Sequence, residues 1–296
     1  MEYKITKEEL GNDLLYLTLR ALKAVFNLYE LDVFVVGARA RDIVMNIMKE
    51  KKPSRETFDL DVAVLLKDWD KFDNICVSLQ ENNFKRIGKT QKFYYKGENG
   101  NLDFEIDLVP YGDIAEDEKI KWPPDGNPEM SVRCFEDVMA HSIDIKVDDN
   151  VSFKIAPIWG QFIIKLDTWN DRHSWTNKDA EDMTIFIKSY WSIHQNDLDF
   201  ENLEELNLDD KDDPIIMGVK LLAYDVSKLL NLNHLKFFAN LLKEEIDKEE
   251  QSILVIHIME YWGSIFDDDN IKFDNCTKVL KTMYNVFENQ IKKLEV

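Results

Sequence analysis

Two aspartates that lie one residue apart are the clearest chemical signal in this chain. Asp59 and Asp61 fall within the stretch Phe58–Val64, which reads FDLDVAV. Successive side chains of an extended strand point to opposite faces, so the two carboxylates share one face of the strand and the apolar side chains share the other. Adjacent carboxylates repel each other unless a cation or a proton intervenes. The pair is therefore predicted to hold Mg²⁺ or Mn²⁺ against a phosphate group.

A glycine turn and a third carboxylate would complete a site for phosphate chemistry. Gly37 ends the apolar run Val33–Val36 and opens a helical pattern, which leaves backbone N–H groups free to receive a phosphate. On a later strand, Asp107 would complete the metal site and accept the proton of an attacking hydroxyl. Glu105 shares the face of Asp107 and is the alternative third ligand.

These residues need strands and helices that bring them together. Alternation and short apolar runs predict strands at 33–36, 58–66, 92–96, 102–109, 143–147 and 151–155. Helical spacing of apolar residues predicts helices at 7–29, 38–49, 68–82, 135–141, 157–170, 177–194, 213–231, 234–247, 250–265 and 275–293. We therefore expect an α+β fold, with a mixed-sheet domain over residues 1–155 and an α-helical domain over residues 156–296.

Composition is that of an ordinary globular protein. Of 296 residues, 45% are hydrophobic and 32% are charged, and no apolar run reaches membrane-spanning length. The N-terminus lacks the apolar core of a signal peptide, and three scattered cysteines favour a reducing compartment, so we expect a cytoplasmic protein that does not associate with a membrane. A net charge of −20 disfavours a simple nucleic-acid binder. The acidic stretch 197–213 is interpreted as a solvated surface.

Six stretches together carry a family resemblance. They are Val36–Asp42, Arg55–Asp61, Asp107–Gly112, Trp122–Pro124, Lys165–Arg172 and Lys178–Asp182. In order and residue type they resemble the nucleotidyltransferase superfamily related to DNA polymerase β, and more narrowly the AbiEii/AbiGii-type toxin nucleotidyltransferases. The resemblance covers about half of the chain and leaves its C-terminal third without a motif.

The resemblance implies a nucleotidyltransferase fold and a two-metal reaction. A nucleoside monophosphate moves from an NTP to an acceptor, and pyrophosphate leaves. Asp59, Asp61 and Asp107 are implied as the catalytic residues and as the ligands of Mg²⁺ or Mn²⁺. Many members of the superfamily carry Gly-Ser or Gly-Gly at the phosphate loop, whereas this chain carries Gly37-Ala38.

Several cations are candidates for nucleotide binding. Because position 38 has no hydroxyl, phosphate capture at Gly37 and Ala38 would depend on backbone N–H groups and on Arg39 or Arg41. Arg55 precedes the acid pair and is a supporting candidate that would reach the phosphate.

A second candidate group of cations lies near the middle of the chain. Lys165 and Arg172 fall on one helical face, and the resemblance implies that they hold the triphosphate of the incoming nucleotide. In the structural alternative they are ion-pair donors to Asp171, Asp179 or Asp182. Asp179 is a further candidate, as the acid that positions Lys165 or Arg172.

The sequence does not determine which molecule accepts the nucleoside monophosphate. The resemblance favours a toxin-like enzyme that modifies an RNA or a protein hydroxyl, with an antitoxin protein as a possible partner. The acidic charge favours a protein or a cationic small molecule, such as an aminoglycoside. A different class of function is a non-catalytic module of the same fold, which binds NTP or a partner protein. The absence of a hydroxyl at Ala38 supports that alternative, and the retention of three candidate carboxylates opposes it.

Overall fold

The chain folds into two units. A computed structural model describes residues 2–48, 57–88, 91–97, 103–123, 126–196, 205–206, 208, 213–263 and 268–295. The units are Met1–Gln161 and Phe162–Val296. Their division falls within helix α6 (Ile158–Arg172), whereas the sequence places the domain boundary after residue 155.

Strands of alternating or apolar sequence form the sheet of the first unit. The strands are β1 (Glu2–Lys4), β2 (Phe34–Val36), β3 (Asp59–Leu65), β4 (Phe84–Arg86), β5 (Lys92–Lys96), β6 (Asp103–Tyr111), β9 (Ile143–Lys146) and β10 (Ser152–Ile155). Within the described residues these eight strands form one sheet in the order β1-β9-β10-β2-β3-β6-β5-β4. β1 and β9, β10 and β2, and β3 and β6 run parallel, and the other neighbours run antiparallel, so the sheet is mixed. A separate hairpin joins β7 (Lys119–Lys121) and β8 (Glu129–Ser131).

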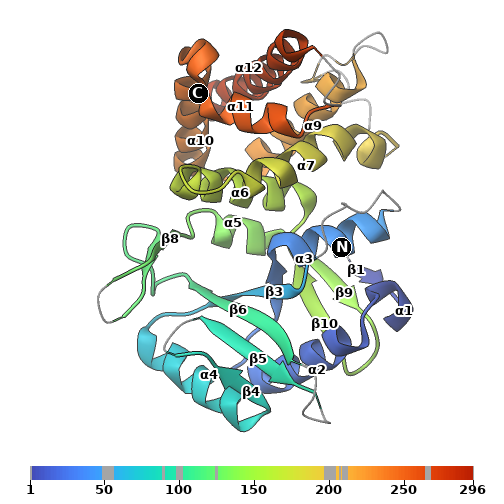
Figure 1. Ribbon diagram of the computed structural model, residues 1–296, viewed down its shortest axis with the longest axis vertical. Helices are drawn as coiled ribbons and strands as arrows, with labels where there is room; N and C mark the ends of the chain where they lie inside the picture. The colour runs from blue at the N-terminus through green and yellow to red at the C-terminus, as the bar shows by residue number, and fades with distance from the viewer. Residues whose placement is uncertain are drawn as a thin grey trace. The chain divides into compact units, whose positions relative to one another are not determined.

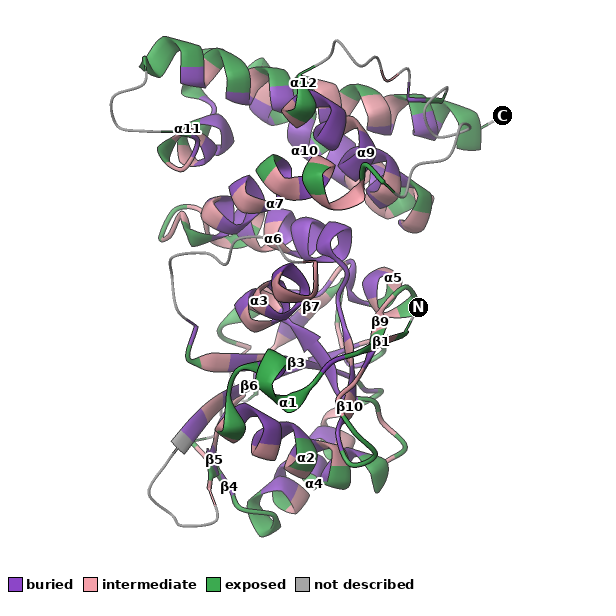
Figure 2. Ribbon diagram, turned by 90° about the vertical axis from the view of Figure 1, so that its right-hand side faces the viewer, coloured by how far each residue is buried: buried purple, intermediate pink, exposed green. Residues whose placement is uncertain are grey.

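Helices cover both faces of this sheet. The helices of the first unit are α1 (Lys7–Leu10), α2 (Asp13–Asn27), α3 (Gly37–Ile47), α4 (Trp69–Glu81) and α5 (Phe135–Ala140). Figures 1 and 2 show α2 and α4 on one side of the sheet and α3 on the other. The even-numbered residues of β3, Leu60, Val62 and Val64, are at most 1% exposed, which places the apolar face of β3 in the core. The odd-numbered Asp59 and Asp61 are only partly buried on the other face.

The second unit is helical throughout its described part. Beyond α6 it contains α7 (Lys178–His194), α9 (Pro214–Leu229), α10 (Leu232–Asp247), α11 (Ile253–Glu260) and α12 (Asp269–Leu294), with a 3₁₀ turn at Glu249–Gln251. α9 packs between α7 and α12, and α10 and α11 also pack on α12. Over the residues that the structure describes, none of the helices combines the length and the apolar character that crossing a membrane requires. The sheet of the first unit and these helices confirm the predicted α+β fold.

Two differences from the predicted elements have local causes. The helix predicted at 7–29 is broken into α1 and α2, because Gly11 adopts φ = 78° as the C-cap of α1 and Asn12 then caps α2 through hydrogen bonds to Leu14 N and Leu15 N. The short strands β1, β4, β7 and β8 were not predicted. Each has three residues, too few for alternation to be read from the sequence.

Asp225 of α9 is a partly buried acid in the second unit. Tyr190 donates a hydrogen bond to Asp225, and burial raises the pKa of the Asp225 carboxyl to about 6 although that hydrogen bond opposes the rise. The unfolded value is about 3.9. Because the folded state binds the proton more tightly, this group adds stability below pH 4, and the contribution disappears as pH rises through 6.

We expect the free energy of unfolding of Asp225→Asn to fall less steeply between pH 4 and pH 7 than that of the wild type. The difference should reach up to about 3 kcal/mol. Urea denaturation at several pH values measures it. Parallel pH profiles of the two proteins would contradict the expectation.

Candidate active site

Four carboxylates share one face of β3 and β6. These strands lie side by side in parallel (Figure 1), with Asp59 opposite Glu105 and Asp61 opposite Asp107. Opposite residues of paired strands point to the same face of the sheet. The negative charge of Asp59 also acts on the Asp107 carboxyl. The structure thus brings Asp59, Asp61 and Asp107 together on one face, while their roles as metal ligands stay predictions.

Gly37 lies against one of these carboxylates. β2 runs antiparallel to β3 with Val36 opposite Asp61, and Gly37 follows with φ = 72° as the first residue of α3. A Cβ atom at Gly37 would lie 2.0 Å from Asp61 Oδ2, so the position has no room for a side chain. A phosphate on the turn at Gly37 and Ala38 would therefore meet the Asp61 carboxylate, and a cation would have to lie between the two anions.

Arg39 is the cation of α3 that faces Asp59. Its guanidinium donates a hydrogen bond to the backbone carbonyl of Thr57 and lies 5.9 Å from the centroid of the Phe104 ring. Burial lowers the pKa of Arg39, and the charges of Asp42 and Asp59 act in the opposite direction. Within the described residues, Arg39 Nε and Thr57 Oγ1 are buried without a hydrogen-bond partner. The Nε–H group of Arg39 is therefore a hydrogen-bond donor beside the carboxylate face without an acceptor in the part of the chain that the structure describes.

Arg41, the second arginine of α3, has an acidic partner of its own. The Arg41 side chain is 1% exposed, and its Nε and Nη2 atoms donate to Asp42 Oδ1 at 3.0 and 2.7 Å. This neighbouring carboxylate already engages the guanidinium that was predicted to bind phosphate. Arg55 lies outside the described residues.

A lysine and a tyrosine of β5 complete the carboxylate face. Lys92 Nζ lies 2.5 Å from Glu105 Oε1 and 3.2 Å from Asp107 Oδ1, and the Tyr94 hydroxyl donates to Glu105 Oε2 at 2.6 Å. Both oxygens of Glu105 are thus engaged, and the hydrogen bonds from Lys92 and Tyr94 lower its pKa. Of the two candidates for the third ligand, the geometry favours Asp107 over Glu105.

Asp107 combines burial with incomplete hydrogen bonding. Its side chain is 18% exposed, and its Oδ1 atom has no hydrogen-bond donor of standard geometry among the described residues, although it forms the ion pair with Lys92. Burial raises the pKa of Asp107, Lys92 opposes that rise, and the charges of Glu105 and Asp59 add to it. A carboxylate with a raised pKa is a better proton acceptor, which suits the role predicted for Asp107.

The residue types on this face suit a hard divalent cation, but the side chains that the structure describes there do not form a metal site. Carboxylate oxygens are the ligands that Mg²⁺ and Mn²⁺ prefer. In the described part of the chain, however, no three Asp, Glu, His or Cys side chains are gathered closely enough to hold a metal ion. Asp107 is directed to Lys92 instead. Metal binding at this face therefore requires the Asp107 carboxylate to separate from the lysine.

The predicted cations of α6 face buried acids of α7. Lys165 Nζ lies 3.2 Å from Asp179 Oδ1 and 2.8 Å from Asp182 Oδ2. Arg172 donates to both oxygens of Asp179 at 2.8 and 2.9 Å. Both aspartate side chains are fully buried. These contacts are the ion pairs of the structural alternative. Asp179 contacts both Lys165 and Arg172 and can therefore position both cations.

Charge compensation keeps Asp179 ionised in the helical unit. Burial alone would raise the pKa of Asp179, but the hydrogen bond from Arg172 and the charges of Lys165 and Arg172 outweigh it and lower the value. Two buried carboxylates thus depend on the two cations. Binding of a triphosphate by Lys165 and Arg172 stays a prediction, and it would have to share these cations with the aspartates.

Sequence reasoning did not identify Lys92 and Tyr94 as part of the face. The strand 92–96 was predicted, and residues 92 and 94 share one of its faces. Their partners are set by the antiparallel register of β5 and β6, which puts Lys92 opposite Asp107 and Tyr94 opposite Glu105. Alternation in both strands could have shown that these side chains share a face. It could not give the register, which depends on the connection between the strands, and residues 98–102 of that connection lie outside the described part.

Comparisons with known proteins identify a weak structural similarity. No family model and no curated protein matches the chain. Among solved structures, it is similar to JHP933 from Helicobacter pylori, at 14% sequence identity and a TM-score of 0.38, with 98% of each chain covered. A similarity at this level supports no conclusion about fold or function.

Proposed function

We propose that this chain is a metal-dependent nucleotidyltransferase of the AbiEii/AbiGii type. The observation that supports the proposal best is that Asp59, Asp61 and Asp107 share one face of β3 and β6, with Asp61 against the Gly37 turn. A cluster of carboxylates is costly for a protein that binds no cation there, because the charges repel each other.

The proposed reaction is transfer of a nucleoside monophosphate. The acceptor hydroxyl oxygen forms a bond to the α-phosphorus, the bond from that phosphorus to the bridging oxygen of the β-phosphate breaks, and pyrophosphate leaves with the electron pair. Asp107 receives the hydroxyl proton, and Arg39 and the backbone at Gly37 orient the phosphates. Bound Mg²⁺ or Mn²⁺ would supply positive charge at the phosphate oxygens, held by Asp59, Asp61 and Asp107.

The acceptor is proposed as a hydroxyl of RNA or protein, which would make the enzyme toxin-like. Transfer to a cationic small molecule such as an aminoglycoside is the alternative acceptor class, because the net charge of −20 attracts cations. A non-catalytic NTP-binding module is favoured by one specific observation, the ion pair that keeps Lys92 on Asp107.

An assay with α-labelled NTPs tests the proposal. Each of the four labelled NTPs is incubated with Mg²⁺ and the purified protein, separately with total RNA, lysate protein and aminoglycosides. We expect label to reach one acceptor class, and transfer to fall at least about a hundredfold in Asp59→Asn. Asp73→Asn is the matched control, because Asp73 is an exposed acid of α4 away from the carboxylate face. Label transfer that is absent in the wild type, or equal in Asp59→Asn, would refute enzymatic transfer.

A further inference from the structure

The carboxylate face already contains a cation of its own. Lys92 Nζ lies within 3.2 Å of oxygens from both Glu105 and Asp107, the two acids that face β3 from β6. Its side chain is 40% exposed, so the ammonium lies at the border between the face and solvent. The lysine therefore occupies space beside Asp107 that a divalent ion would need.

We infer that Lys92 is a built-in counter-cation, which competes with divalent metal ions for Asp107 and so sets their affinity. This inference rests on the proposed metal-dependent function. Lys92 neutralises part of the repulsion among the carboxylates, so the face is tolerated in the metal-free protein. A divalent ion must then replace the ammonium at Asp107, and it is also repelled by that ammonium from a few ångströms away.

Glu105 allows a divalent ion to replace the Lys92 ammonium at Asp107 without a movement of the strand. The Lys92 ammonium is closer to Glu105 than to Asp107, at 2.5 against 3.2 Å, and Tyr94 fixes the other oxygen of Glu105. A small movement of the lysine toward Glu105 would free the Asp107 oxygen, which has no other hydrogen-bond donor among the described residues. Lys92 therefore acts as a positioning residue and not as a metal ligand or a catalytic residue.

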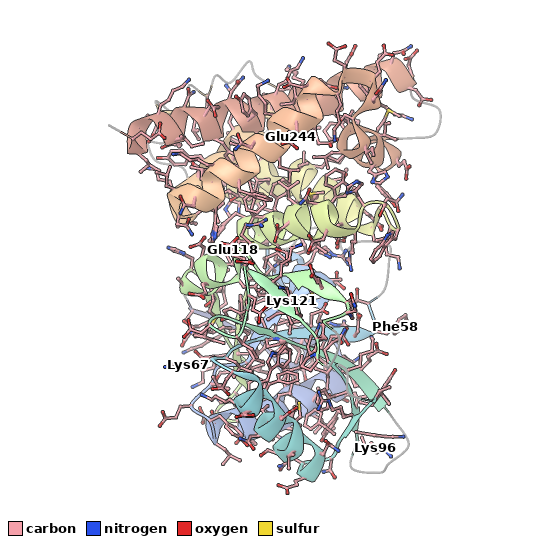
Figure 3. The ribbon with its side chains drawn as sticks, turned by 90° about the vertical axis from the view of Figure 1, so that its left-hand side faces the viewer. Phe58, Lys67, Lys96, Glu118, Lys121 and Glu244 are labelled. Carbon is pink, nitrogen blue, oxygen red and sulfur yellow. The ribbon has the colours of Figure 1, made fainter. Side chains whose placement is uncertain are left out.

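The test is the affinity for Mn²⁺, measured by electron paramagnetic resonance on the full chain without nucleotide. We expect Lys92→Met to bind Mn²⁺ at least about tenfold more tightly than the wild type, because a neighbouring positive charge has been removed. Lys96→Met is the matched control. Lys96 lies on the same face of β5 and is exposed near the end of the strand (Figure 3), and its removal changes the net charge equally. Lys92→Arg keeps the charge and should bind Mn²⁺ as the wild type does.

The outcomes separate this inference from the proposed function. Equal affinities of Lys92→Met and Lys96→Met, or weaker binding by Lys92→Met, would overturn the inference and leave the proposed function in place. A wild type and variants that all fail to bind Mn²⁺ would overturn both.

A second measurement needs no variant. Acetylation of lysine amines in the wild type, mapped by mass spectrometry, should increase several-fold at Lys92 when Mn²⁺ is added and stay constant at Lys96, because the ammonium of Lys92 has separated from Asp107. Bound Mn²⁺ with unchanged labelling of Lys92 would also overturn the inference.

Discussion

Replacement of Gly37 by alanine should remove the proposed transfer activity and lower the free energy of unfolding by about 2–5 kcal/mol. Two costs contribute. An L-residue at φ = 72° is strained by about 1–2 kcal/mol. The new methyl group would also lie 2.0 Å from Asp61 Oδ2, so the carboxylate or the turn has to move, and such overpacking costs about 1–3 kcal/mol. The displaced group belongs to the carboxylate face, so transfer activity should be lost even while the variant is folded.

Gly88→Ala is the matched control for this experiment. Gly88 has φ = 60°, but no atom lies within 4 Å of the position that its Cβ would take. The control therefore carries the backbone strain without the contact. We expect it to lose about 1–2 kcal/mol and to keep its activity. Urea denaturation and the labelled-NTP assay measure both variants. Equal behaviour of the two would mean that the contact between Gly37 and Asp61 has no functional consequence.

Lys165→Met should destabilise the protein by about 3–5 kcal/mol. The change leaves Asp182 and part of Asp179 buried without the cation that compensates them, and an uncompensated buried charge has a cost of that order. Lys178→Met is the control, because Lys178 is an exposed lysine at the start of α7 and its loss changes the net charge equally. Urea denaturation of the full chain measures the difference.

A double variant shows whether the ion pair causes that loss. Lys165→Met/Asp182→Asn also removes one of the two buried charges that Lys165 contacts, so we expect part of the stability to return. A Lys165→Met variant as stable as Lys178→Met would exclude a structural role for the ion pairs of Lys165 and favour its role in binding the triphosphate. Loss of stability together with retained nucleotide affinity would remove Lys165 from the nucleotide site.

The sequence was most informative where one face of an element is buried. Regular apolar spacing predicted α4, α7 and α9 within one or two residues of their observed ends, because burial of that face determines both the pattern and the helix. Alternation in 58–66 correctly separated the core face of β3 from the face that carries Asp59 and Asp61. Three-residue edge strands such as β1 were missed, since their pairing depends on a partner far away in the chain.

The contacts of charged side chains were less predictable. A pattern indicates that Lys92, Arg41 and Lys165 are cations, but not which carboxylate each one meets. Lys92 meets Asp107 through strand register, Arg41 meets its neighbour Asp42, and Lys165 meets Asp179 and Asp182 through the packing of α6 and α7. Such pairings depend on tertiary geometry within a few ångströms, which spacing along the chain does not contain.

We expect the carboxylate face to bind a nucleotide through divalent metal ions. Calorimetric titration of NTP into the wild type and Asp59→Asn, each with and without Mg²⁺, tests it most directly. We predict that the wild type binds NTP only with Mg²⁺, that Asp59→Asn does not bind in either condition, and that the two proteins melt within a few degrees of each other without metal, because the variant relieves repulsion between carboxylates. Equal Mg²⁺-dependent binding by both proteins, or a metal-free variant that melts far below the wild type, would contradict the claim.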